Sequence, residues 1–128
     1  MGARILIVDD EKQLVHGLQQ VLLPEFPGSS VDAAYSGEEA LSCLAKVAYD
    51  LIIADLRMPG FDGLELIKGV RYLYPDVPVI LMTGYGSESI QAEATKLGVK
   101  RYIDKPFDID EMVREVSQLL PEREQAGD

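Results

Sequence analysis

The chain contains few cysteines and few basic residues. Its 128 residues include one cysteine, and 12 lysines and arginines stand against 22 aspartates and glutamates, giving a net charge of −10 at pH 7. So acidic a surface repels polyanions, which argues against direct binding to nucleic acid or to an anionic membrane. The single cysteine, Cys43, excludes an internal disulfide and fits a reducing compartment. We therefore expect a cytoplasmic protein.

Long hydrophobic runs are also missing. The longest, residues 51–54 and 77–82, are far too short to cross a membrane, and no secretory signal is visible at the N-terminus. An apolar fraction of 47% is nevertheless too high for a disordered chain, and the length suits a single core. We expect one domain over residues 1–121, followed at 122–128 by a C-terminal tail or the start of a linker.

Two hydrophobic periods alternate along the chain. Strand-like apolar segments occupy residues 5–8, 31–35, 51–54, 77–82 and 101–103, and each is followed by apolar residues at helical spacing. Pro24 is expected to end the first helix, and Ser36 with Glu39 forms a capping box before the second. The alternation predicts an α/β fold of the flavodoxin-like, doubly wound kind. Its five-stranded parallel sheet, in the order 2-1-3-4-5, would carry helices on both faces.

Polar side chains stand directly after the predicted strands. Asp9 and Asp10 follow the first strand, Asp55 the third, Thr83 the fourth and Lys105 the fifth. Ligands of such sheets bind beyond the carboxyl ends of the strands. Since the first and third strands are neighbours in the expected order, the three aspartates should meet.

Three carboxylates at one place repel one another. Two of them about 5 Å apart repel by roughly 3 kcal/mol at an effective dielectric constant of ~20, so cations must compensate. The Lys105 ammonium and a divalent ion would both do so, and oxygen ligands in an acidic site favour Mg²⁺. These cations with the Thr83 hydroxyl suit phosphoryl transfer. Asp55, which ends a central strand before a Pro/Gly-rich loop, is the natural nucleophile.

With these residues in place, the sequence resembles the CheY-like receiver domain of response regulators in two-component signal transduction. The resemblance covers roughly residues 4–120 and rests on Asp9–Asp10, Asp55–Gly60, Thr83–Gly84 and Lys105–Phe107. It implies that Asp55 accepts a phosphoryl group from a sensor histidine kinase or a histidine phosphotransfer protein. Such a domain is a phosphorylation-dependent switch, not a conventional enzyme, and catalyses only its own phosphorylation and slow dephosphorylation.

The resemblance also implies a metal shell. Asp10 and Asp55 would bind Mg²⁺ directly, Asp9 mostly through water, and the backbone carbonyl of Arg57 would complete the shell. Arg57 and Tyr85 stand two residues after the aspartate and the threonine. Because both are bulky, we expect them to hinder attacking water and to prolong the phosphorylated state.

The switch implied by the resemblance involves the other end of the sheet. Thr83 and Lys105 would bind the new phosphate, and Lys105–Pro106 would be a cis peptide bond. Tyr102 stands at the switch-aromatic position and would swing inward as Thr83 moves. The fourth helix carries few large apolar residues, which indicates low local stability. The face formed by the fourth helix, fifth strand and fifth helix would then control an effector or partner, with a C-terminal effector domain and a homodimer formed on phosphorylation left open.

Each of these residues also has a plainer interpretation. The acid pair could cap the first helix, Thr83 could be a turn hydroxyl, Lys105 a surface lysine and Tyr102 a packing residue. We expect Glu11 to be a first-turn acid that favours the helix dipole. The remaining candidates, His16 and Cys43, are expected to be a solvated helix residue and a packing residue.

Three rival functions share parts of the pattern. A phosphohydrolase that uses an aspartate would need a second acid at the position of Arg57, so the general acid is missing. A flavodoxin-like cofactor binder would need a phosphate loop rich in glycine and hydroxyl groups after the first strand, where this chain has acids. A degenerate receiver would lack the acid pair, Asp55 or Lys105, and all of them are present.

Overall fold

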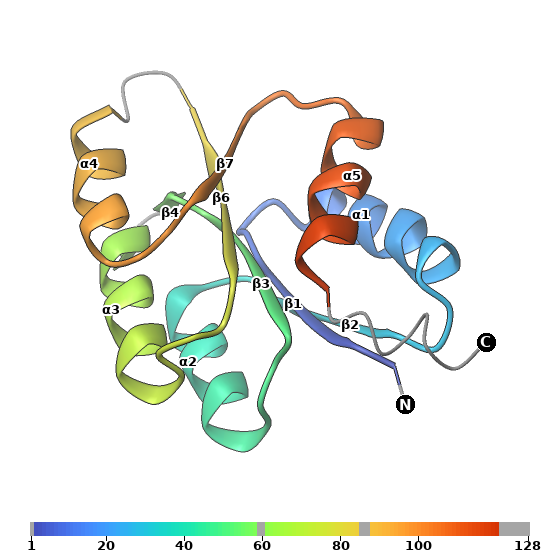
Figure 1. The fold of residues 1–128 in the computed structure, drawn as a ribbon, viewed down its shortest axis with the longest axis horizontal. Coiled ribbons are helices and arrows are strands. Elements are labelled where there is room, and N and C mark those ends of the chain that lie inside the picture. Colours follow the sequence, from blue (N-terminus) through green and yellow to red (C-terminus); the bar gives the residue numbers. More distant parts are fainter. Residues whose placement is uncertain (1, 59–60, 85–87, 121–128) are drawn as a thin grey trace.

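Five parallel strands form the central sheet of the computed structural model, which describes residues 2–58, 61–84 and 88–120 (Figure 1). The strands are β1 (Arg4–Val8), β2 (Ser30–Ala34), β3 (Leu51–Asp55), β6 (Val79–Thr83) and β7 (Arg101–Asp104). They lie in the order β2-β1-β3-β6-β7, and every neighbouring pair is parallel. Counted within this sheet alone, the order is the predicted 2-1-3-4-5.

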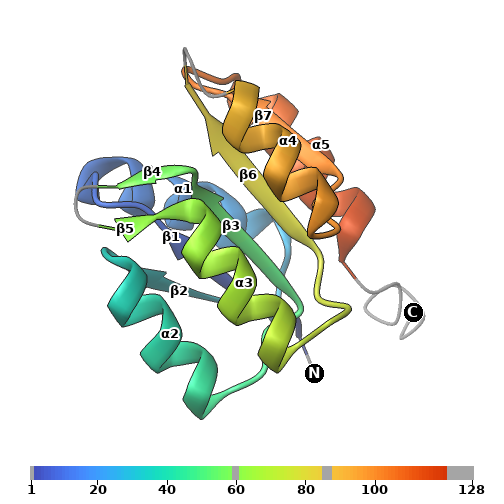
Figure 2. The same ribbon diagram turned by 90° about the vertical axis from the view of Figure 1, so that its left-hand side faces the viewer.

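A short hairpin follows β3, and this is why the strand labels skip two numbers. Its strands β4 (Arg57–Met58) and β5 (Phe61–Asp62) pair antiparallel, and they stand at the carboxyl end of β3 in Figure 2. The sequence led us to expect only a loop over residues 56–63, which was wrong. Two residues per strand are too few to produce a readable alternation of apolar and polar side chains.

Helices cover both faces of the sheet in the part of the chain described. Figure 1 shows α1 and α5 on one side of the sheet and α2, α3 and α4 on the other, which confirms the doubly wound, three-layer α/β fold. The helices are α1 (Lys12–Glu25), α2 (Gly37–Lys46), α3 (Gly63–Leu73), α4 (Glu88–Lys96) and α5 (Ile109–Leu119).

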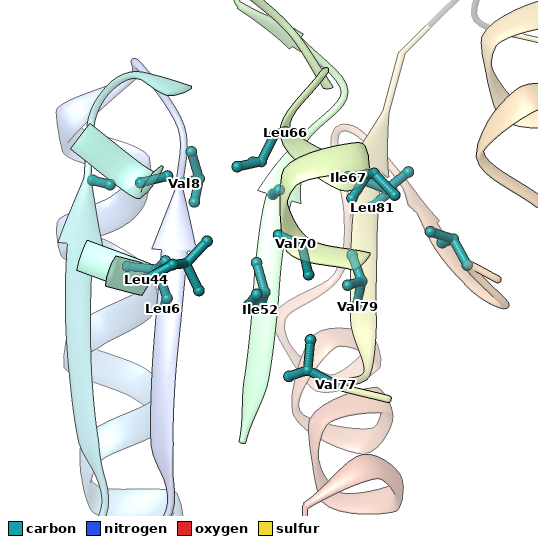
Figure 3. Packing of buried hydrophobic residues seen from close by; sticks show 14 of the residues in the cluster. Leu6, Val8, Leu44, Ile52, Leu66, Ile67, Val70, Val77, Val79 and Leu81 are labelled. Atoms are coloured by element: carbon teal, nitrogen blue, oxygen red, sulfur yellow. The ribbon is translucent and has the colours of Figure 1, made fainter. Parts of the chain in front are cut away.

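The side chains of each central strand alternate between two hydrophobic clusters. In β1, Ile5 and Ile7 pack with α1 and α5, whereas Leu6 and Val8 pack with α2 and α3. Figure 3 shows the second cluster, in which Leu66 and Val70 of α3 lie over β3 and β6. A strand that is buried on both faces must be apolar at every position, and this explains the continuous apolar runs of the sequence.

Two helix-end signals of the sequence, the capping box before α2 and Pro24, have different outcomes. The Ser36 Oγ accepts a hydrogen bond from the Glu39 N–H at 3.1 Å, and the Glu39 carboxylate reaches back to the Tyr35 N–H. Pro24 does not end α1, as we expected, but lies in its last turn, one residue before Glu25. So near the end of the helix, the missing proline N–H removes only one terminal hydrogen bond.

Gly63 closes the segment behind Asp55. Its N–H donates to the Leu56 carbonyl at 2.8 Å, so the chain returns to the end of β3 and begins α3 there. A Cβ atom on Gly63 would lie 2.8 Å from that carbonyl oxygen and 2.9 Å from the Leu56 Cα. Both neighbours are backbone atoms, so this position requires glycine.

We predict that Gly63→Ala destabilises the fold by about 1–3 kcal/mol, since the methyl group forces the Leu56 backbone aside. Gly17→Ala is the matched control. Gly17 is exposed on the solvent side of helix α1, with nothing within 4 Å of its added Cβ, so alanine should stabilise by about 0.5–1 kcal/mol. Urea unfolding of both variants measures the difference, and equal stabilities would contradict the close approach at Gly63.

Candidate functional site

The carboxyl ends of β1 and β3 bring three aspartates together. The two strands pair in register up to Val8 and Ala54, so the residues that follow, Asp9 and Asp55, are neighbours. One carboxylate oxygen each from Asp9, Asp10 and Asp55 lies within 4.8 Å of the other two. Asp9 and Asp55 are buried, whereas Asp10 is exposed to solvent. The predicted meeting of the acid pair with Asp55 is therefore present in the structure.

The Lys105 ammonium binds two of these carboxylates. Its Nζ lies 2.7 Å from the Asp9 Oδ2 and 3.2 Å from the Asp55 Oδ2. The backbone N–H of Lys105 donates to the Thr83 carbonyl at 2.7 Å, which fixes the lysine beyond the end of β7. Its peptide bond to Pro106 is cis, the isomer that the family resemblance implied. Lys105 is thus no free surface lysine.

Glu11 is a third partner of the same ammonium, at 3.0 Å from Nζ. The sequence led us to expect a first-turn acid, but Glu11 is the N-cap residue of α1 and its side chain makes no cap hydrogen bond. Its carboxylate instead faces Lys105, to which it is brought by a turn in which the Asp9 Oδ1 accepts from the Glu11 N–H at 2.9 Å. In the sequence, only the position of Glu11 directly after the acid pair could have indicated its contact with Lys105.

Burial and like charge perturb the titration of the site. Burial raises the pKa of Asp55 above its usual range, and the charge of Asp9 adds to this effect. The charge of Lys105 and the Arg57 N–H, which donates to the Asp55 Oδ1 at 3.3 Å, oppose the rise without cancelling it. Burial alone would lower the pKa of Lys105, but its hydrogen bonds to Asp9 and Glu11 and the nearby carboxylate charges raise it instead. The ammonium therefore stays charged and offsets part of the acid cluster.

Thr83 ends β6 beside this cluster, but its hydroxyl faces a different partner. The side chain is fully buried, and its Oγ1 donates to the Asp104 Oδ1 at 2.9 Å, with the Ile103 carbonyl at 3.4 Å. Asp104 is the residue of β7 directly paired with Thr83. Asp104 could not be recognised from the sequence, because a carboxylate beside a lysine at a strand end looks like ordinary surface charge.

Tyr102 lies under α4. Its ring packs against the cluster on the α2–α4 side of the sheet, and its hydroxyl lies 2.6 Å from the Thr95 Oγ1. The same hydroxyl lies 3.2 Å from the Gln91 carbonyl. Tyr102 is therefore half-buried and bonded to α4, and its expected role as a switch residue stays a prediction.

His16 is exposed on α1, and Cys43 is half-buried at the edge of the α2–α4 cluster, in agreement with the roles expected for them. Tyr85, residues 59–60 and the tail at 122–128 lie outside the described residues. The parts of the chain that are described contain no helix long and apolar enough to span a membrane.

Comparison with models of protein families matches residues 5–117 to the response regulator receiver domain. The chain belongs to this family. Response regulator protein FleR of Pseudomonas aeruginosa is 38% identical over 131 residues, which cover 99% of this chain but only 27% of FleR. Sporulation initiation phosphotransferase F of Bacillus subtilis is 36% identical over 121 residues, which cover 94% of this chain and 96% of that protein.

Solved receiver structures have the same fold. The response regulator TrrA of Thermotoga maritima, solved in complex with Mg²⁺ and BeF, superposes with a TM-score of 0.79 at 36% identity, covering 92% of this chain and 99% of TrrA. The chemotaxis response regulator CheY4 of Vibrio cholerae gives 0.83 at 29% identity, covering 94% of this chain and all of CheY4. Receiver domains are phosphorylation-dependent signalling domains that work with histidine kinases in two-component systems, and not conventional enzymes.

We predict that Asp55→Asn stabilises this receiver domain at neutral pH in the absence of divalent ions. A carboxyl group whose pKa is higher in the folded than in the unfolded state costs stability once it ionises. That cost is absent below the unfolded-state pKa of about 3.9 and grows as the pH rises through the folded-state pKa. Removing the charge should therefore add on the order of 1 kcal/mol at pH 7.

Urea unfolding in EDTA between pH 4 and pH 8 measures this gain. Asp110→Asn is the matched control, since Asp110 is exposed in the first turn of α5 and is not one of the three clustered aspartates. The gain for Asp55→Asn should shrink toward pH 4. A variant less stable than the parent at pH 7 would show that Lys105 already neutralises the site.

Proposed function

We propose that this receiver domain accepts a phosphoryl group on Asp55 from the phosphohistidine of a sensor histidine kinase or a histidine phosphotransfer protein. The observation that carries the proposal is the contact of the Lys105 ammonium with Asp55 and Asp9, beside a cluster of three carboxylates. The nucleophile and a cation that can bind phosphoryl oxygens are thus held together at the ligand-binding edge of the sheet.

In the proposed step, an Asp55 carboxylate oxygen attacks phosphorus while the phosphorus–nitrogen bond of the donor breaks. The bonding electron pair leaves with the ring nitrogen. The ring departs as neutral imidazole when its other nitrogen carries a proton, and otherwise takes a proton from water, so the step requires no general acid from this chain. Lys105 can pass from the carboxylates to the phosphoryl oxygens with little movement. Attack of water on the aspartyl phosphate reverses the modification, and this slow step is the only other chemistry that we propose for the domain.

The acidic residues fit a bound Mg²⁺. Asp9, Asp10 and Asp55 offer only oxygen ligands at mutual distances that one ion can span, and their charge exceeds what Lys105 compensates. The backbone carbonyl of Arg57, the first residue of β4, is proposed as a further ligand. When bound, Mg²⁺ would neutralise charge on the carboxylates and the phosphoryl group.

The output is proposed to follow from Thr83 and Tyr102. Thr83 lies on β6 and Tyr102 on β7, at the end of the sheet that α4 covers. Within α4, Ala94 is the one fully buried residue. So little burial permits α4, β7 and α5 to change shape at modest cost and to alter binding to an effector or a second copy.

We propose that the receiver domain extends over residues 1–121. The chain spans a quarter of FleR but nearly all of phosphotransferase F, so effector attachment differs among its relatives.

The assignment predicts that Mg²⁺ and acetyl phosphate add one phosphoryl group to the protein, which hydroxylamine removes, as expected of an acyl phosphate. Asp55→Asn should abolish incorporation, because the amide is not a nucleophile at this site, and EDTA should prevent it. Intact-mass spectrometry measures the product. Asp110→Asn is the control and should react as the parent does, whereas full incorporation in Asp55→Asn would place the phosphoryl group elsewhere.

A groove beside the site gives the donor domain a place to dock. It has a volume of about 680 Å³ and lies between α1 and the segment from Lys105 into α5, with Leu14, Leu18 and Phe107 among its apolar lining. Lys105 lines the groove and contacts Asp55, so a phosphohistidine that reaches Asp55 brings its own domain against this surface. We propose that the phosphohistidine domain occupies this groove.

Gly17 provides the test, since it lines the groove and a Cβ atom added to it would have nothing within 4 Å outside its own helix backbone. We predict that Gly17→Glu leaves phosphorylation by acetyl phosphate unchanged but slows transfer from a phosphorylated kinase or phosphotransfer domain at least tenfold, because the charge is desolvated on docking. Gly17→Ala is the control for the loss of glycine. Equal slowing with both donors would mean that the variant damages the Asp55 site itself.

A further inference from the structure

The Thr83 hydroxyl is fully engaged away from the acid cluster. It donates to the Asp104 Oδ1 at 2.9 Å, and the only second acceptor in reach among the described residues is the Ile103 carbonyl at 3.4 Å. Both acceptors belong to β7, on the side of β6 opposite to β3, which carries Asp55. The hydroxyl therefore faces away from the place where a phosphoryl group on Asp55 would form.

A hydroxyl group has a single proton to donate. In the proposed function, Thr83 donates that proton to a phosphoryl oxygen, so it must first leave the Asp104 carboxylate. A hydrogen bond to an ionised acceptor is stronger than one to a neutral acceptor. Asp104 and the phosphoryl group therefore compete for one donor, and the strength of the Asp104 contact sets how readily Thr83 changes partner.

We propose that Asp104 is a positioning residue that holds Thr83 in the resting conformation and so opposes the phosphorylated state. This inference rests on the proposed function of Asp55 and adds to it the residue that biases the switch. Asp104 can do this without being essential to the fold, because its side chain is exposed and its backbone pairs within the sheet whatever side chain it carries. Loss of the carboxylate leaves Thr83 the Ile103 carbonyl as a remaining acceptor.

The test measures binding of beryllofluoride with Mg²⁺, a stable mimic of the phosphoryl group, by titration followed in ¹H–¹⁵N spectra. Asp104→Ala should bind the mimic roughly three- to tenfold more tightly than the parent, the range expected for losing one competing hydrogen bond to a partly exposed acceptor. In its free form, the amide signals of Thr83 and Tyr102 should already be displaced toward their mimic-bound positions. Asp104→Asn keeps an acceptor oxygen without the charge and should fall between parent and alanine variant.

A double-mutant cycle with Thr83→Val separates positioning from simple charge repulsion. Valine has no hydroxyl, so in that background Asp104→Ala should leave the affinity for the mimic unchanged. An effect of equal size with and without the Thr83 hydroxyl would overturn the proposal, because it would show that Asp104 acts only by repelling the anion. Unchanged or weaker binding in the single Asp104→Ala variant would also overturn it.

The two proposals fail in different ways. If the parent protein binds no beryllofluoride with Mg²⁺ and takes no phosphoryl group from acetyl phosphate, the function assigned to Asp55 is wrong. If the parent binds the mimic and the Asp104 variants bind it with the same affinity, the function assigned to Asp55 is correct and the positioning role of Asp104 is wrong. Asp110→Asn, exposed on α5, serves as the charge-matched control in both measurements.

Discussion

The contact of one ammonium group with three carboxylates is the constraint on which the site depends. Lys105 lies within 3.2 Å of Asp9, Glu11 and Asp55, and it reaches them from the far end of the chain. Without it, burial of Asp9 and Asp55 side by side would force a proton onto one of them. With it, the acids are partly compensated, and an excess of negative charge remains for a divalent ion. The same geometry thus reduces the cost of burying the acids and leaves the site attractive to cations.

The sequence was sufficient to predict the buried strands, from the hydrophobic period, and the meeting of the acids, from the order of the strands. A strand such as β1 is apolar at every position because Ile5 and Leu6 face different clusters, and this pattern is readable without a structure. Once the order of the strands is known, the meeting of Asp9 with Asp55 follows from their places at two neighbouring strand ends. The family resemblance added the roles of the individual residues, which period and order do not contain.

The sequence could not predict features that leave no trace in the hydrophobic period, above all contacts between single polar side chains. The hairpin after β3 is too short to show alternation, and Glu11 and Asp104 look like ordinary surface acids until Lys105 and Thr83 are placed beside them. Arg71 is a similar case, for its guanidinium donates to the carbonyls of Val77 and Leu97 and so ties α3 to the segment before β6 and to the end of α4. Each of these contacts depends on three-dimensional placement to within an ångström.

The two sides of the site differ in what holds them, and this difference suits a switch. On the side of β1 and β3, buried strands and a charge-assisted network fix Asp9 and Asp55. On the side of β6 and β7, α4 packs through little apolar surface, and the Tyr102 hydroxyl is bonded to Thr95 and to the Gln91 carbonyl. Hydrogen bonds at a protein surface exchange partners at low cost, whereas buried apolar contacts do not. In the proposed function, a new anion at the rigid side is followed by rearrangement at the other. Thr83 lies between the two sides, since its carbonyl accepts from the Lys105 N–H and its hydroxyl donates to Asp104.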